Sequence, residues 1–215
     1  MNKSKLITES RVYKLTGLTP ILGSAPASRA IRTQYIASKA PTDKLREEEE
    51  AAPFDLDEKG LTVFNRNKQD QLCLMGYQIK GFLKGALTAL KAQCKIAAAK
   101  GKIDNLVFVE PRYIPLEKNG APIRDEDDIL ERPLRAQTMQ GERVTLAASE
   151  LVEDPWEITI EITMIPNNGT AKSEAVSWDA IEAALDYGAY HGLGQWRNAD
   201  YGRFVWEQVE EQVEE

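Results

Sequence analysis

The sequence has few of the residues that most often build metal sites, disulfide frameworks and catalytic triads. It contains one histidine, His191, and two cysteines, Cys73 and Cys94, among its 215 residues. One histidine rules out a histidine-rich metal site and argues against a Ser-His-Asp triad. The cysteines do not stand at metal-ligand spacing, and reduced thiols in a cytoplasmic protein are their simplest interpretation. We therefore expect no metal, no other cofactor and a cytoplasmic location.

Long hydrophobic runs are also missing. No stretch reaches the roughly 18 consecutive apolar residues that mark a membrane-spanning segment. Residues 1–9 contain no apolar core of the kind found in secretory signals. These absences disfavour secretion and membrane insertion, so no membrane partner is expected.

The net charge of −7 at first argues against a nucleic-acid ligand. The charge is, however, unevenly distributed. Residues 1–40 carry seven basic side chains and one acid, and residues 76–102 carry six lysines and no acid. The acids are concentrated in 47–58, 125–131 and 207–215. A folded chain with segregated charge can present a basic face despite a low isoelectric point, so the total charge does not identify the partner.

The first half of the chain predicts a strand, a long insertion, a hairpin and a helix. Residues 11–22 alternate between apolar and polar positions, as a strand does, until Pro20 and Gly23 interrupt the pattern. Residues 24–58 show no clean period and are interpreted as an insertion, in which Asp43 is expected to be a solvated loop residue. Residues 60–75 read as a hairpin whose polar turn is 65–70.

The helix expected after this hairpin has one apolar face and a neighbouring row of lysines. Its buried face is predicted from the spacing of Ile79, Leu83, Ala86, Leu87, Leu90, Cys94 and Ala97. Lys80, Lys84, Lys91 and Lys95 follow an adjoining stripe, which is typical of lysines that extend beside a core or of a phosphate-binding face. Three glycines lie within residues 76–85, where exposed amides and the helix dipole favour an anion.

The second half predicts strands, one more helix and a final strand. A strand is expected over 103–109, followed by a Pro- and charge-rich excursion over 110–145 with a hairpin that turns near Gly141. Arg132, Arg135 and Arg143 are predicted to be exposed along that hairpin, where surface arginines usually serve solubility. Strict alternation predicts a strand over 156–164. Ser177 is placed to cap a helix, and Phe204 begins the last strand.

This order of elements predicts the fold class. Strand, helix, two strands, helix and strand form an RRM/ferredoxin-like βαββαβ core, an α+β arrangement with an antiparallel sheet and two helices on one face. Long loop and hairpin insertions elaborate it. We expect a single domain over 1–206 and a frayed acidic tail over 207–215.

The stretch from Gly188 to Phe204 is the most unusual in composition. It holds four glycines and two arginines, Arg197 and Arg203, among large aromatic side chains. One interpretation is a loop that only reverses the chain. The other is a backbone cradle for a polyanion, since glycine permits close approach of a ligand and arginine has the forked donors that suit phosphate. Tyr190, Trp196 and Tyr201 would then offer a stacking surface for bases.

Three segments resemble one family, in the same order. Leu18-Thr-Pro-Ile-Leu-Gly-Ser24 resembles the end of the first strand of the RAMP superfamily, the RRM-like backbone subunits of CRISPR effector complexes. Gly76-Tyr-Gln-Ile-Lys-Gly-Phe-Leu-Lys-Gly-Ala86 resembles that family's "G-S-S-I-K-G-x-L-R" helix start. Gly192-Leu-Gly-Gln-Trp-Arg-Asn-Ala-Asp-Tyr-Gly-Arg-Phe204 resembles its C-terminal glycine-rich loop. The order and spacing of the three segments agree with the family across nearly the whole chain.

The resemblance implies a single-stranded RNA-binding protein that lines up head to tail as a homo-oligomer or filament, with other CRISPR-type subunits as further partners. RNA or DNA is left open as the ligand. Lys80, Arg197 and Arg203 match the family's RNA-contacting basic residues, and its thumb hairpin corresponds to part of 112–143. The candidate binding set is Lys80, Gly81, Lys84, Gly192, Gly194, Trp196, Arg197, Tyr201 and Arg203.

The chain also departs from the family pattern. Tyr77 and Gln78 replace the paired serines, and Lys84 stands where an arginine is common. Some members cut RNA with an aspartate in the first insertion; Asp43 is the positional match, but nothing around it supports that role, so no catalysis is predicted. A divergent stand-alone or phage-encoded relative fits these departures. The alternatives are a protein-interaction module or mimic that docks on a host nucleic-acid complex and, third, a metal-dependent ribonuclease.

Overall fold

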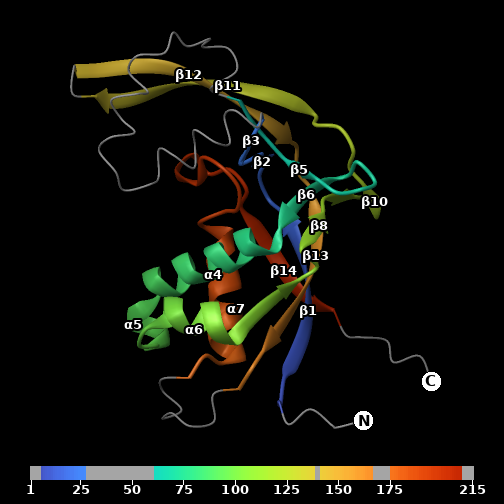
Figure 1. The fold of residues 1–215 in the computed structure, drawn as a ribbon, viewed down its shortest axis with the longest axis vertical. Coiled ribbons are helices and arrows are strands. Elements are labelled where there is room, and N and C mark those ends of the chain that lie inside the picture. The colour runs from blue at the N-terminus through green and yellow to red at the C-terminus, as the bar shows by residue number, and fades with distance from the viewer. Residues whose placement is uncertain (1–5, 28–60, 139–140, 167–174, 210–215) are drawn as a thin grey trace.

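The protein is a mixed α+β structure rich in antiparallel sheet (Figure 1). The structure, a computed structural model, describes residues 6–27, 61–138, 141–166 and 175–209, with the side chains of 134–146 left out. Most of the predicted insertion over 24–58, including Asp43, lies outside the described residues. The α+β class predicted from the order of elements is confirmed.

The main sheet is built around two strands from opposite halves of the chain. β1 (Glu9–Gly17) pairs antiparallel with β13 (Glu157–Met164), and Tyr13 lies opposite Ile160. β14 (Phe204–Val209) pairs antiparallel with the free side of β1, and β7 (Val107–Glu110) pairs antiparallel with the free side of β13. The resulting order is β7–β13–β1–β14. The short strands β9 (Glu117–Lys118) and β10 (Ala121–Pro122) extend the β7 edge.

Alternation along β1 and β13 separates a buried face from an open one. Tyr13 and Leu15 are fully buried, as are Ile158, Ile160 and Ile162 of the partner strand. Because side chains alternate across a strand, the residues between them face the other side. The alternation predicted over 156–164 is confirmed. It places one continuous apolar surface beneath the helices.

The helices gather on one side of this sheet (Figure 1). They are α4 (Gly76–Ala89), the short α5 (Lys91–Cys94), α6 (Ala99–Leu106) and α7 (Trp178–Asp186). The predicted cap of α7 is confirmed, since the Ser177 hydroxyl accepts a hydrogen bond of 3.3 Å from the Ala180 amide. The predicted face of α4 is buried at Ile79, Leu83, Ala86 and Leu87.

Two helix boundaries differ from the prediction. The expected continuous helix stops at Ala89, and Lys95 is left-handed with a φ of 52°. The strand expected over 103–109 begins only at Val107, because residues 99–106 form α6. Ile103 and Ala99 stand four residues apart and are both buried, which is helical spacing. The apolar residues that predicted a strand over 103–109 therefore belong partly to the buried face of α6.

A second sheet carries a long hairpin that projects beyond the body of the molecule (Figure 1). β11 (Asp128–Thr138) and β12 (Gly141–Val152) pair antiparallel from Asp128 opposite Leu151 to Thr138 opposite Gly141. At its base, β12 pairs antiparallel with β2 (Ile21–Leu22) and in parallel with β4 (Leu61–Val63), which pairs with β3 (Ala25–Pro26).

This hairpin lies later than the excursion predicted over 110–145. Residues 107–118 and 121–122 contribute short strands to the sheets, and the hairpin runs from Asp128 to Val152. The prediction that Arg132 is exposed is wrong, since only 6% of Arg132 is accessible. Its guanidinium lies over the Trp196 ring of the glycine-rich loop. Arg135 and Arg143 lie among the side chains that are not described.

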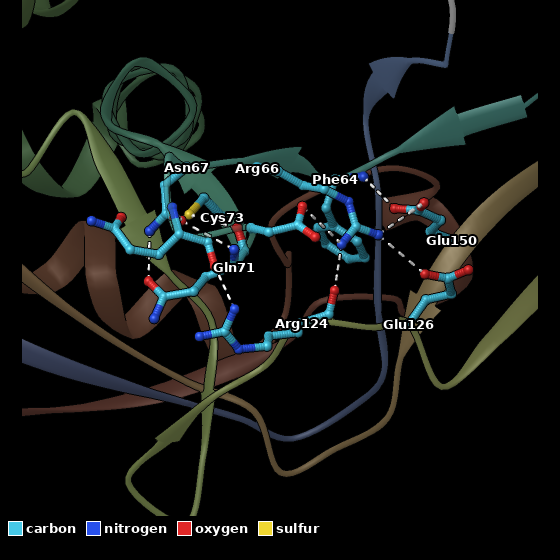
Figure 2. A network of polar contacts seen from close by, with 10 residues as sticks. Phe64, Arg66, Asn67, Gln71, Cys73, Arg124, Glu126 and Glu150 are labelled. Atoms are coloured by element: carbon cyan, nitrogen blue, oxygen red, sulfur yellow. Dashed lines mark hydrogen bonds and ion pairs between the residues drawn. The ribbon is translucent and has the colours of Figure 1, made fainter.

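A polar network fastens the base of the hairpin to a third, small sheet of β5 (Asn65–Arg66), β6 (Leu72–Met75) and β8 (Tyr113–Pro115). Figure 2 shows Arg66 at its centre, donating to the Arg124 carbonyl and lying 3.4 Å from Glu126 Oε2. The buried Glu150 accepts a hydrogen bond of 2.7 Å from the Phe64 amide (Figure 2). Burial raises the pKa of the Glu150 carboxyl.

The last strand is longer than the sequence suggests. β14 continues to Val209, which lies opposite Val12 of β1. The first three residues of the predicted acidic tail over 207–215 are therefore strand, and 210–215 lie outside the described residues.

Candidate nucleic-acid interface

The glycine-rich loop is closed at its neck by two glycines in contact. After α7 the chain forms the 3₁₀ turns η2 (Tyr187–Ala189) and η3 (Arg197–Ala199) and then enters β14. The Leu193 amide donates to the Gly202 carbonyl at 2.8 Å. A Cβ on Gly192 would lie 2.2 Å from the Gly202 carbonyl carbon, and Gly202 has a φ of +71°. Only glycine satisfies both conditions at this neck.

The loop is also held against the turn between β1 and β2. The Gly202 amide donates to the Pro20 carbonyl at 2.7 Å, and the Gln195 amide to the Leu22 carbonyl at 3.4 Å. A Cβ on Gly194 would lie 2.6 Å from that same Leu22 oxygen. The amides of Leu193, Gln195 and Gly202 are thus used inside the fold. They do not belong to the backbone cradle that the composition suggests.

Two of the predicted stacking residues form a pair on this loop. The rings of Trp196 and Tyr201 lie 5.5 Å apart with an interplanar angle of 13°. Trp196 has a φ of 52°, an uncommon conformation for a bulky residue, and it remains 38% exposed. Tyr190 is 78% exposed. The loop therefore holds Trp196 in a fixed, partly exposed position.

A buried arginine lies against this pair. The Arg132 guanidinium carbon is 4.9 Å from the centre of the Trp196 ring, and one terminal nitrogen donates to the Ser149 hydroxyl at 3.0 Å. Ser149 is in turn 2.6 Å from the Thr62 hydroxyl. The Arg132 Nε has no hydrogen-bond partner among the described residues. Burial lowers the pKa of this guanidinium.

Sequence reasoning missed the role of Arg132. In the sequence it is one of three arginines on a predicted hairpin, with no pattern to link it to a loop more than fifty residues later. The face that Arg132 occupies follows from the β11–β12 pairing, and that pairing depends on contacts between distant segments.

The two arginines of the loop differ in their exposure to solvent and in their contacts. Arg203 is half-buried, and its Nε donates to the Ala189 carbonyl at 2.7 Å. Arg197 is exposed and forms no ion pair with any described residue. Its charge, together with burial as the larger cause, lowers the pKa of His191, whose ring stacks on Tyr187. Arg197 is therefore the loop arginine that faces solvent.

The predicted lysines of α4 lie elsewhere and have a partner. The Lys84 amine forms a 2.8 Å ion pair with Asp104 of α6, and the Lys80 amine donates to the Asp104 carbonyl at 3.0 Å. Gly81, between them, is exposed, and a Cβ there would meet nothing within 4 Å. Asp104 of α6 thus pairs with one lysine of the stripe through its carboxylate and binds a second through its backbone carbonyl.

The structure does not bring the predicted α4 residues and the predicted loop residues together. The Lys80 amine lies 5.0 Å from the ring centre of Phe108, on the edge strand β7. Arg203 directly precedes β14, at the opposite edge of the sheet. With β13 and β1 in between, roughly 14 Å of sheet separates the edge strands. The loop and the helix start are separate surfaces.

The open face of the main sheet is acidic. Lys14 forms a 2.8 Å ion pair with Glu157, and this hydrogen-bonded carboxylate, together with the charges of Glu207 and Glu117, raises the Lys14 pKa. Residues opposite one another in neighbouring strands share a face. By that register the open face carries five glutamates around Lys14: Glu110, Glu117, Glu157, Glu161 and Glu207.

Within the residues that the structure describes, no three histidine, cysteine, aspartate or glutamate side chains are grouped so as to hold a metal ion. None of the described helices combines the length and the apolar character needed to cross a membrane. Comparison with known proteins adds no assignment: no family model matches the chain, and no curated protein matches it.

Proposed function

We propose that this chain is a non-enzymatic, single-stranded RNA-binding protein with an RRM/ferredoxin-like βαββαβ core. The core consists of β1, α4, β7, β13, α7 and β14 in chain order, and the sheet order β7–β13–β1–β14 supports the assignment. The antiparallel pairing of every neighbour in that order supports it as well.

The observation that carries the proposal is the stacked pair of Trp196 and Tyr201. Its rings are 5.5 Å apart, on a loop held rigid by its glycines and backed by the buried Arg132. Single-stranded nucleic acids bind by stacking bases on such rings while cations follow the backbone. The exposed Arg197, next to Trp196 in sequence, supplies a cation. The RNA path therefore runs over the loop and along the root of the hairpin.

Charge favours the loop over the open sheet face and over the surface that carries Lys80 and Lys84. Phosphates are repelled by the five glutamates of the open sheet face. Lys84 is already paired with the Asp104 carboxylate, and both Lys80 and Lys84 lie toward the other edge of the sheet. Among the described residues, the loop is the one of these three surfaces that places an exposed arginine beside a stacked pair of aromatic rings.

The resemblance to the RAMP superfamily suggests that several copies of the chain bind one RNA together. In this proposal the β11–β12 hairpin acts as the thumb, and copies of the chain line up along RNA as a homo-oligomer in the cytoplasm. Antiviral defence, with CRISPR-type subunits as further partners, is the setting that the resemblance suggests. A divergent stand-alone or phage-encoded protein is compatible with the same site.

The acidic open face favours one alternative. Five glutamates on a flat sheet surface resemble the spaced negative charge of a nucleic acid, which suits a protein-interaction module or mimic that docks on the basic groove of a host complex. In that case the chain binds protein through the sheet and has little affinity for RNA.

A salt series with fluorescent single-stranded RNA and DNA tests the proposal. Wild-type protein is expected to bind RNA at low salt and to lose affinity steeply as salt rises. Replacing Trp196 and Arg197 by alanine is expected to weaken binding at least about tenfold, because base stacking alone is worth roughly 1–3 kcal/mol. Tyr190→Ala, which removes a more exposed but unstacked neighbour, is the matched control.

The outcomes separate the candidates. No binding by micromolar protein at low salt rejects the RNA proposal and leaves the docking alternative. Equal loss in the Tyr190→Ala control removes the stacked pair from the site. Cleavage of the RNA by wild-type protein with Mg²⁺ present, absent in a mock purification, contradicts the non-enzymatic assignment. Size-exclusion chromatography with and without RNA tests assembly.

A further inference from the structure

A hollow of about 310 Å³ lies at the other edge of the sheet, between the first turn of α4 and the edge strand β7. It is lined by Gly76, Tyr77 and Lys80 of α4 and by Phe108, Val109, Glu110 and Arg112 in and just after β7. This volume is at the lower end of the range for small-molecule pockets, roughly 300–1,000 Å³. It suits a ligand the size of one nucleotide.

The floor of the hollow is fixed by backbone contacts. The Gly76 amide donates to the Arg112 carbonyl at 3.1 Å, and Met75 lies opposite Tyr113 in the β6–β8 pair. A Cβ on Gly76 would lie 2.9 Å from the Val109 carbonyl oxygen. Glycine at this position lets the helix begin in direct contact with β7. The residues of the walls are therefore held at set positions before any ligand arrives.

Two aromatic side chains of this hollow remain in contact with solvent. Tyr77 is 66% exposed and Phe108 is 43% exposed. The Lys80 amine lies 5.0 Å from the Phe108 ring centre. Exposed aromatic faces at a hollow offer a planar ligand a surface on which to stack.

The cations of the hollow are available to a phosphate. Lys80 uses one of its three N–H donors for the Asp104 carbonyl. Arg112 is exposed and pairs with no carboxylate of the described residues, and its guanidinium lies 5.8 Å from the Tyr113 ring centre. Glu110 is the one opposing charge among the lining residues. The hollow thus combines flat apolar rings with an excess of positive charge.

We propose that this hollow binds a single nucleotide, with the base stacked on Phe108 and Tyr77 and the phosphate held by Lys80 and Arg112. The site is separate from the stacked pair on the glycine-rich loop, at the opposite edge of the sheet, and it stands or falls independently of RNA binding there. The nucleotide is either free in solution or one unit of a strand. Both sources share the same chemistry.

Titration of ¹⁵N-labelled full-length protein with 5′-AMP, adenosine and inorganic phosphate tests the site. AMP is expected to shift the amide signals of residues 76–80 and 108–112 and to bind about tenfold more tightly than either part alone, since both halves of the ligand are recognised. Phe108→Ala and Arg112→Ala are expected to weaken AMP at least about fivefold. Glu110→Gln is expected to tighten it, because one repulsive charge is removed.

Two control variants separate loss of the binding site from loss of the fold. Phe108→Leu preserves apolar burial but removes the flat ring, so it is expected to lose AMP while its unfolding midpoint stays close to wild type. Trp196→Ala is expected to leave AMP binding unchanged. Shifts centred on the loop, adenosine binding equal to AMP, or full affinity in Phe108→Ala overturns the proposal, as does the absence of any shift at millimolar AMP.

An RNA arm identifies the source of the nucleotide. If Phe108→Ala also weakens an RNA oligonucleotide, the hollow receives a unit of the strand. If it weakens AMP alone, the hollow serves a free nucleotide. Failure of wild-type protein to bind RNA would reject the function proposed for the loop and leave the AMP result intact.

Discussion

The Arg132 guanidinium carbon lies 4.9 Å from the centre of the Trp196 ring, so the projecting hairpin and the glycine-rich loop meet through a cation and an aromatic face. Only 6% of Arg132 is accessible, and no carboxylate among the described residues pairs with it. A buried cation without a counter-ion is costly for stability. We expect this cation to hold the Trp196 ring in place.

Arg132→Met tests that role. Replacing a buried charge by an apolar side chain of similar length is often neutral or stabilising, so the free energy of unfolding is expected to stay equal or rise. RNA affinity is expected to fall about fivefold or more, because a cation–π contact worth roughly 1–2 kcal/mol no longer fixes the ring. Arg132→Lys, which keeps the charge without the planar group, is the control. A variant that binds RNA as wild type does would show that the contact is only structural.

Gly202 is expected to be the least replaceable glycine described. An added Cβ would lie 2.0 Å from the Leu193 carbonyl oxygen, at a φ of +71°. Gly202→Ala is expected to cost at least about 2 kcal/mol in urea unfolding, since backbone cannot move aside as a side chain can. The matched change Gly81→Ala, in open space on α4, is expected to stabilise by roughly 0.5–1 kcal/mol. Equal stabilities for the two variants would contradict this account.

Asp104 is expected to restrain the lysines of α4. Its carboxylate is 2.8 Å from the Lys84 amine, and that hydrogen bond lowers the Asp104 pKa. If phosphates reach this face, Asp104→Asn should tighten RNA binding at low salt, and the gain should vanish in a Lys84→Ala background. The check is fluorescence anisotropy of the two single variants and the double variant. A gain that persists without Lys84 would assign the effect to long-range charge alone.

The buried Glu150 predicts a pH dependence of stability. Burial raises its pKa above the ordinary 4.5, so at pH values just above 4.5 the folded chain binds more protons here than the unfolded chain does. Stability then falls as pH rises through that window. Glu150→Gln keeps an acceptor for the Phe64 amide and cannot ionise. Thermal midpoints measured from pH 4 to 7 should therefore fall for wild type relative to the variant; parallel curves would show that Arg66 fully compensates the buried charge.

The strongest local patterns predicted the frame of the fold. Isoleucines at every second position between 158 and 162 specify a half-buried strand, and Ser177 before an amphipathic run specifies a helix start. These signals depend on neighbouring residues only, which is why a sequence reveals them. The same dependence on neighbouring residues explains why the strand predicted from Ile103 is wrong. A short apolar run does not distinguish a strand from the buried face of a helix.

The candidate site was predicted in part. The loop composition identified Trp196, Tyr201 and Arg197, whose neighbours are largely in the same segment. It did not reveal that the Gln195 and Gly202 amides bond to the segment 20–22, that Asp104 contacts two lysines, or that Arg132 is buried. Each of those facts is a contact between distant segments, and a lysine stripe has the same appearance in sequence whether or not a carboxylate faces it.

The pairing of β3 with β4 brings together two points of the chain that are distant in sequence. Pro26 lies opposite Thr62, and the Ala27 amide donates to the Leu61 carbonyl at 3.3 Å. Residues 25–27 and 61–63, which flank the intervening segment, are therefore held side by side. The entropy of closing a loop between fixed ends changes only slowly with its length, by roughly 0.6 kcal/mol per doubling. The core can thus accept segments of very different length and content at this point, which makes it a natural place for related chains to diverge and for a tag or a second domain to be inserted.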